Sequence, residues 1–334
     1  MKNFICLFIT LCFSLQSFSQ MKYSLNSGEN NALWYVKDYH KDDLSTKFFN
    51  ETEWIPATVP GTIFVDAVNA GLEKEPNFGD NIYQVDKDKY NKDHIYRLEF
   101  NVPENKDLAQ KRIWLNFDGI NRSGEIYLNN NLLGSLKGMM MRGRFDVTKL
   151  INKKGTNLLS VIVSLPNQRR HPEEKFANLA SPTYLSSAGW DWMPYVPGLN
   201  TGITDNVYLT FTQDVTLQDP WIRTKLHNRA EFAEVEISTE IENCSSRKVV
   251  VELSGVITPG NIKFRKELLL EADTAQTIIL DGRVIKELRI KEPRLWWPNG
   301  MGETNLYECK LAIAVNGRIS DEKQITFGIR EYTY

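Results

Sequence analysis

Short runs of alternating apolar and polar residues constrain the fold of this chain more than any other feature of its sequence. The period of these runs is two, not the roughly 3.6 of a helix, and they are rich in β-branched and aromatic residues. In the first part of the chain the runs are residues 95–102, 112–117, 125–128, 157–163 and 207–211. Asn129, Asn130 and Asn131 predict a tight turn, because Asn tolerates a positive φ. We therefore expect an all-β protein, with one short helix that begins after Thr62 and ends at Gly71.

The strand-like runs of the chain form two sets, and the first set ends at Phe211. The stretch 212–220 leads into the second set, which is residues 234–241, 249–253, 264–270, 275–280, 306–315 and 323–327. About seven short strands in about 115 residues are typical of an immunoglobulin-like sandwich, and the larger first unit suits a jelly roll. We place the boundary near Asp214. This predicts a jelly-roll β-sandwich over residues 21–213, followed by an immunoglobulin-like β-sandwich over residues 214–334.

The first twenty residues have the organisation of a signal peptide. Lys2 precedes an apolar run over residues 4–15, and residues 17–19 (Ser-Phe-Ser) form a small-x-small cleavage pattern. The run is too short to span a bilayer comfortably, and no later stretch has about 18 uncharged apolar residues. The sequence predicts a signal peptide over residues 1–20, a mature chain that is secreted or periplasmic, and no membrane partner.

Export affects the expectation for the cysteines, because Cys244 and Cys309 are the two that remain after the signal peptide. A disulfide between them is one alternative. Cys309 shares strand parity with Leu311 and Ile313 and should point inward, whereas Cys244 lies at a strand end on the opposite parity from its apolar neighbours. This mismatch favours two free thiols.

Charge and motif content argue against several classes of function. With 40 basic against 42 acidic residues and no dense Lys/Arg block, the chain lacks the electrostatic footprint of a nucleic-acid binder. Its four histidines are scattered and have no metal-ligand spacing. The sequence has no glycine-rich phosphate loop and no nucleophile elbow. We expect no nucleic-acid partner, no metal site and no cofactor.

The strongest candidate for a binding site is the segment Trp190, Asp191 and Trp192. Two large amphipathic rings flank one carboxylate, and Pro194 and Pro197 stiffen the chain that follows. Such a segment can form an apolar wall for one face of a sugar, beside an acceptor for its hydroxyl groups. A Trp-rich corner of the core, with Asp191 capping backbone amides, accounts for the same residues. The motif alone leaves both interpretations open.

A succession of motifs resembles glycoside hydrolase family 2. In the first unit these are Trp54 with Val-Pro-Gly at 59–61, Leu-Asn-Phe-Asp-Gly at 115–119, Glu-Ile-Tyr-Leu-Asn at 125–129, Leu-Gly at 133–134 and Arg-Phe-Asp-Val-Thr at 144–148. In the second they are Pro-Arg-Leu-Trp-Trp-Pro-Asn-Gly at 293–300, Leu-Tyr at 306–307 and Phe-Gly-Ile-Arg-Glu at 327–331. The first group is similar to the sugar-binding jelly roll of the family, and the second to its immunoglobulin-like domain.

Within the family, residues 189–192 with Asn-Thr-Gly-Ile at 200–203 are most similar to the branch of β-mannosidases, mannosylglycoprotein endo-β-mannosidases and exo-β-glucosaminidases. Two departures are Asn130, where a turn Gly is usual, and Thr204-Asp205, where the family often has Trp.

The resemblance also implies that the catalytic domain is absent. In the family, an acid/base Glu and a nucleophilic Glu lie in a third, (β/α)8-barrel domain that begins shortly after the Phe-Gly-Ile-Arg-Glu motif, whereas this sequence ends at Tyr334. The resemblance therefore implies that the chain has no catalytic residue. It implies that Trp190, Asp191 and Trp192 bind substrate at the mouth of the barrel. The implied partners are a β-linked oligosaccharide or glycan and a barrel domain that is missing or separately encoded.

Three hypotheses follow. The first is the non-catalytic N-terminal portion of a truncated or split retaining glycosidase, which acts on β-mannosides or related β-linked glycans and is inactive as this chain alone. The second is a free-standing carbohydrate-binding module, and the third is a purely structural sandwich. The ending at residues 331–334, in the middle of a motif, favours the first hypothesis.

Overall fold

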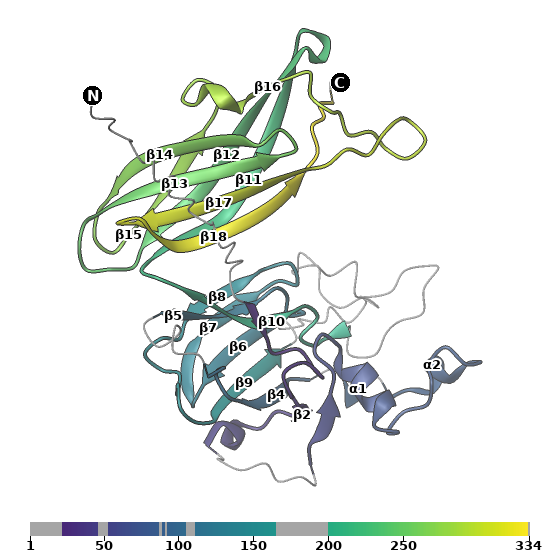
Figure 1. The fold of residues 1–334 in the computed structure, drawn as a ribbon. Coiled ribbons are helices and arrows are strands. Elements are labelled where there is room, and N and C mark those ends of the chain that lie inside the picture. Colours follow the sequence, from purple (N-terminus) through teal and green to yellow (C-terminus); the bar gives the residue numbers. More distant parts are fainter. Residues whose placement is uncertain are drawn as a thin grey trace, which may run out of the picture.

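The computed structural model describes residues 22–45, 53–86, 89–90, 92–104, 111–164 and 200–332. Strands dominate this part of the chain, and Figure 1 shows them in two bodies, one coloured purple to teal and the other green to yellow. The helical segments described are short: α1 (Ile63–Asn69), α2 (Asn81–Gln84) and 3-10 turns at Lys41–Ser45, Asn228–Ala230 and Lys286–Leu288. The predicted all-β class, with two sandwiches, is confirmed.

The first domain is a sandwich of two antiparallel sheets. Its described strands are β1 (Lys22–Ser24), β2 (Trp34–Asp38), β3 (Ile55–Ala57), β4 (His94–Phe100), β5 (Arg112–Phe117), β6 (Ser123–Leu128), β7 (Asn131–Lys137), β8 (Gly143–Asp146), β9 (Asn157–Ser164) and β10 (Val207–Thr212). The order β1-β10-β5-β8 forms one sheet, and β3-β2-β4-β9-β6-β7 forms the other. Because side chains alternate along a strand, Leu98 on β4 and Leu115 on β5 both enter the core between the sheets.

The second domain is a smaller sandwich with its own core. Its described strands are β11 (Val215–His227), β12 (Phe232–Asn243), β13 (Val249–Thr258), β14 (Ile262–Leu270), β15 (Thr274–Leu280), β16 (Arg289–Lys291), β17 (Tyr307–Val315) and β18 (Arg318–Phe327). One sheet has the order β11-β12-β15, with β16 also paired to β12, and the other has the order β14-β13-β17-β18.

The two cores are separate along the chain. The hydrophobic cluster of the first domain includes Phe211, and that of the second domain begins at Val215. The division of the chain at Asp214 remains our proposal, and these two clusters support it. The link between β10 and β11 consists of Gln213 and Asp214, which is much shorter than the predicted connecting stretch 212–220.

The short helix, the asparagine turn and the inward-pointing Cys309 all lie where the sequence predicts them. The helix after Gly61 is α1, and Thr62 is its N-cap, although its side chain donates and accepts no capping hydrogen bond. Asn129 and Asn130 both have a positive φ, as the predicted turn requires. Cys309 is buried and Cys244 is half-buried, and both are free thiols. Among the described residues, no helix combines the length and the apolar character needed to cross a membrane.

Candidate functional site

Trp190, Asp191 and Trp192, the predicted binding residues, lie outside the described residues. The structure does describe the segment that follows them, which begins at Asn200 and leads into β10. The described part of the candidate site consists of this segment and of the parts of the first domain that hold it in place.

A pair of backbone hydrogen bonds joins Gly202 to Asn121. The amide of Asn121 donates to the Gly202 carbonyl, and the amide of Gly202 donates to the Asn121 carbonyl, both at 2.9 Å. The side-chain amide of Asn121 donates to the carbonyl of Asn200 at 2.7 Å. Asn121 is completely buried. Asn121 therefore fixes the path of the chain at residues 200–202.

A second contact joins the same segment to the start of α1. Gly61 donates its amide to the Ile203 carbonyl at 2.8 Å, and Ile63 donates to the Thr201 carbonyl at 2.9 Å. A Cβ atom on Gly202 would lie 2.4 Å from the carbonyl oxygen of Gly61, which is far below a van der Waals contact. Only glycine allows the two backbones to approach this closely. Segments near residues 61, 121 and 202 therefore meet in a compact frame.

Arg122 places a buried positive charge beside this frame. Its side chain is 2% exposed, and its carbonyl accepts the amide of Gly138 at 2.7 Å. A buried guanidinium is unfavourable unless it is bonded or paired. Our sequence reasoning missed Asn121 and Arg122. The available signal was that two polar residues interrupt the apolar pattern after Ile120, at a position where the chain enters β6.

Two carboxylates, those of Asp118 and Asp205, lie beside the frame. Tyr208 donates its hydroxyl to Asp118 at 3.1 Å, and burial, together with the charge of Asp118, raises the pKa of Tyr208 to about 12. Asp205 is exposed and accepts the backbone amide of Asn206 at 2.7 Å. A Cβ atom on Gly119 would lie 3.2 Å from the Cβ of Asp205, so the two carboxylates belong to neighbouring turns. Their oxygens can accept hydrogen bonds from hydroxyl groups.

A further carboxyl group, that of Asp66, lies on α1. Asp66 is completely buried, and its Oδ1 accepts the amide of Thr58 at 2.7 Å. Tyr96 directs its hydroxyl to Oδ2 at 3.5 Å. Burial raises the pKa of Asp66 to about 7. Because Asp66 has no access to solvent, it cannot contact a substrate, and we assign it to holding α1 against the turn that contains Thr58.

The chemistry that these groups support is binding. The frame supplies a fixed backbone, and Asp118 and Asp205 beside it supply carboxylate acceptors. No group of His, Cys, Asp or Glu side chains suited to a metal ion occurs in the part of the chain that the structure describes. The expectation of no metal and no cofactor stays a prediction.

Two family models match consecutive parts of the chain. Residues 34–205 match the model described as "Glycosyl hydrolase 2 galactose-binding domain-like", and residues 215–330 match the model described as "Glycosyl hydrolases family 2". The first match alone covers more than half of the chain, and the second begins directly after the link at Gln213 and Asp214.

Curated relatives and solved structures agree with this match. A mannosylglycoprotein endo-β-mannosidase of Lilium longiflorum is 30% identical over an alignment of 300 positions, and the match covers 83% of this chain and 30% of that protein. An exo-β-D-glucosaminidase of Streptomyces avermitilis is 25% identical over 293 residues, with coverage of 86% and 30%. The crystal structure of Amycolatopsis orientalis exo-chitosanase has a TM-score of 0.74 at 21% identity, over 90% of this chain and 33% of that one. The chain spans about a third of the length of these proteins.

Proposed function

Because the chain belongs to glycoside hydrolase family 2, we propose that it is the non-catalytic N-terminal portion of a glycosidase that acts on β-mannosides or related β-linked glycans. Its two domains are the galactose-binding-like and immunoglobulin-like domains of that family, in the branch that includes β-mannosidases and exo-β-glucosaminidases. In this proposal the two domains help to form the sugar site of a catalytic barrel.

One observation carries the proposal. Both family models match in the order in which the two domains occur, while the chain spans 30% of the first relatives' length. Glycoside hydrolysis needs two carboxyl groups on either side of the scissile bond. We assign these groups to a (β/α)8 barrel in the remaining length of the whole enzyme, and we propose that the mature protein is secreted or periplasmic because residues 1–20 have a signal-peptide pattern.

The proposed role of Trp190, Asp191 and Trp192 is to bind the non-reducing sugar. The frame at Asn121, Gly61 and Gly202 supports this role, because it anchors the chain shortly after these residues. Asp191 would accept hydrogen bonds from sugar hydroxyl groups, and the indole rings would form an apolar wall. A side chain that binds a substrate in a defined geometry needs such a rigid support.

The test uses the full enzyme, or this chain joined to a family 2 barrel, and compares wild type with Asp191→Asn. An ionised acceptor that bonds a sugar hydroxyl contributes roughly 1.5 to 3 kcal/mol, so we expect kcat/KM to fall about ten- to hundredfold. The melting temperature should stay unchanged. Asp273→Asn is the matched control, because Asp273 is an exposed carboxylate in the second domain. If the melting temperature falls while kcat/KM holds, Asp191 is a structural cap and the assignment is wrong.

A free-standing carbohydrate-binding module is the second candidate, and the galactose-binding-like description of residues 34–205 favours it. The two proposals differ in the affinity expected of the isolated chain. Titration calorimetry with a β-manno-oligosaccharide should show weak binding if half of the pocket belongs to a barrel. Micromolar binding by the isolated chain would instead support the module.

A further inference from the structure

Three of the four backbone polar groups of the link between the two domains take part in hydrogen bonds. The amide of Gln213 donates to the Ser320 carbonyl at 2.9 Å, and the Asp214 carbonyl accepts the amide of Cys244 at 2.9 Å. The hydroxyl of Thr212 donates to the Gln213 carbonyl at 2.8 Å. Flexible linkers have backbone groups that bond to water. Here the link is instead bonded to β18 and to the end of β12 in the second domain.

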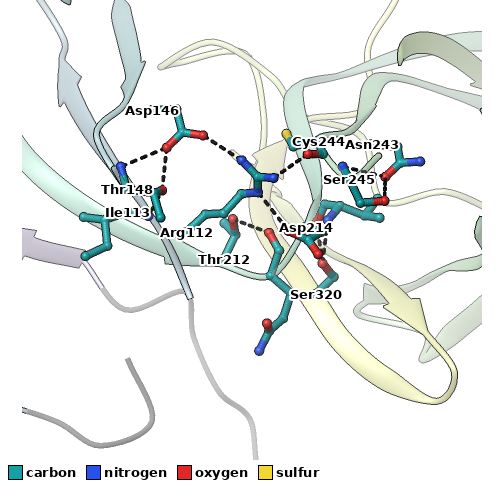
Figure 2. Close-up of polar contacts among 12 residues, drawn as sticks. Arg112, Ile113, Asp146, Thr148, Thr212, Asp214, Asn243, Cys244, Ser245 and Ser320 are labelled. Atoms are coloured by element: carbon teal, nitrogen blue, oxygen red, sulfur yellow. Dashed lines mark hydrogen bonds and ion pairs between the residues drawn. The ribbon is translucent and has the colours of Figure 1, made fainter. Parts of the chain in front are cut away.

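Arg112, the first residue of β5, is the centre of this junction (Figure 2). Its Nη1 donates to Asp146 at 2.7 Å, and its Nε donates to Asp214 at 2.9 Å. Its Nη2 donates to the carbonyl of Cys244. The three nitrogens of one planar group therefore bond to the first domain, to the link and to the second domain. A lysine could not reproduce this fork, because its single nitrogen has no fixed plane.

Asp146 is itself held in position. One of its oxygens accepts the amide of Thr148 at 2.9 Å and also the Thr148 hydroxyl, as Figure 2 shows. The amide of Ile113 then donates to the Thr148 hydroxyl at 3.0 Å. The carboxylate of Asp146, which Arg112 contacts in the first domain, is therefore held in a hydrogen-bonded turn. The guanidinium of Arg112 is thus bonded to fixed groups in both domains.

A second arginine crosses the junction beside the first. Arg144 on β8 lies over the ring of Trp114, with its guanidinium carbon 3.5 Å from the ring centroid. Its Nη1 lies 3.5 Å from the carboxylate of Glu242 on β12. Trp114 donates its indole N–H to the hydroxyl of Thr212 at 2.8 Å. The stack of Arg144 on Trp114 therefore connects β8 to the second domain and to Thr212, the last residue of β10, directly before the link.

The second domain fixes its own side of the junction. Ser320 accepts the amide of Val215 at 3.0 Å and donates its hydroxyl to the Val215 carbonyl at 2.6 Å. Asp321 accepts the amide of Leu217 at 2.9 Å. Ser320 and Asp321 are both buried. These bonds attach the first residues of β11 to β18, so the strand that leaves the link cannot swing independently of its domain.

We propose that Arg112 is a positioning residue that holds the two sandwiches as one rigid body. Rotation of one domain about the link would have to break at least one bond of its fork. Exposed ion pairs taken singly contribute little to stability. Arg112 differs because its side chain is 23% exposed, and its bonds form a network on a planar group. The inference goes beyond the proposed function, since it holds whether or not the chain binds a sugar.

The test compares the whole chain with Arg112→Lys and Arg112→Ala by small-angle X-ray scattering and calorimetry. For wild type we expect one unfolding transition and a scattering profile that fits a single arrangement. Both variants should show a larger maximum dimension, and their unfolding should separate into two transitions. Arg223→Ala is the control, because Arg223 pairs with Glu236 inside the second domain. That variant should keep the profile and the single transition of wild type.

Two outcomes for Arg112→Ala and for wild type would overturn the proposal. One is an Arg112→Ala protein whose scattering profile and single transition match those of wild type. The other is a wild-type protein whose two domains tumble with different correlation times in NMR relaxation. If Arg112→Ala does not fold, Asp214→Asn provides the same test, because it weakens one bond of the fork and leaves the arginine in place. An unchanged profile for a folded Asp214→Asn together with an unchanged profile for Arg112→Lys would also contradict the proposal.

Discussion

Asp66 shows how a single buried carboxyl group can make the stability of a β-sandwich depend on pH. Burial raises its pKa from the ordinary 3.8 to about 7 in the folded protein. The folded state therefore binds the proton more tightly than the unfolded state does. The stabilisation is complete below about pH 4 and is lost as the pH rises through 7. A difference of about three pKa units corresponds to roughly 4 kcal/mol in the free energy of unfolding.

We therefore predict that Asp66→Asn flattens the pH dependence of stability. Wild type should lose stability between pH 4 and pH 7, whereas the amide cannot ionise and should not. The measurement is urea unfolding of both proteins at each pH, with the exposed Asp273→Asn as the control. The free-energy difference between wild type and Asp66→Asn should change by up to about 4 kcal/mol over this range. A difference that is constant with pH would show that Asp66 does not titrate there.

Sequence reasoning at the residue scale succeeded where the cause is local. Asn129 and Asn130 adopt a positive φ because the turn between β6 and β7 needs it, and Asn is the residue that tolerates it after Gly. Strand parity correctly placed Cys309 inside the second core. Arg122 and Asp66 could not be assigned in this way, because their burial depends on segments distant in the sequence. Asp66, for example, accepts a hydrogen bond from Tyr96, which is 30 residues away.

At the element scale, β11 is the strand that the sequence pattern does not predict. It runs from Val215 to His227, but its pairing with β12 shifts between Gln218 and Trp221. Asp219 has a positive φ, and Pro220 follows it. Both residues are unusual inside a regular strand, but both are compatible with a bulge. The sequence predicts residues 212–220 as a connection, because Asp219 and Pro220 are typical of a loop when the pairing partner is unknown.

The frame at the candidate site leads to a prediction about Gly202. In Gly202→Ala the new Cβ would meet the backbone of Gly61 at 2.4 Å, and backbone atoms cannot move aside as a flexible side chain can. We expect a loss of about 3 kcal/mol in the free energy of unfolding. Gly28→Ala is the control, because Gly28 has a positive φ but open space around its Cα. That change should cost about 1 kcal/mol, and an equal loss in both variants would contradict the role of close approach.

At the scale of the whole molecule, the period-two pattern was enough to predict two β-sandwiches in sequence. Each sandwich needs one apolar face per sheet, and such faces are visible in the sequence as alternation. The junction between the domains has no such signal. Arg112 bonds to residues that are 102 and 132 positions later in the chain, and nothing near Arg112 indicates them. The relative placement of two domains therefore required the three-dimensional structure, as did the frame around Asn121.

The last prediction follows from the proposal that these two domains help to bind the sugar while the barrel carries the catalytic groups. Residues 21–334, purified as a separate protein, should not hydrolyse an aryl β-mannoside or an aryl β-glucosaminide. Binding residues can orient a sugar, but cleavage also needs one carboxyl group to protonate the leaving oxygen and a second to act as nucleophile or base. We assign both groups to the barrel. The measurement is release of the aryl group against a buffer blank and a mock purification from the same host. Turnover that follows the chain through successive purification steps, above the mock level, would show that these two domains carry catalysis themselves.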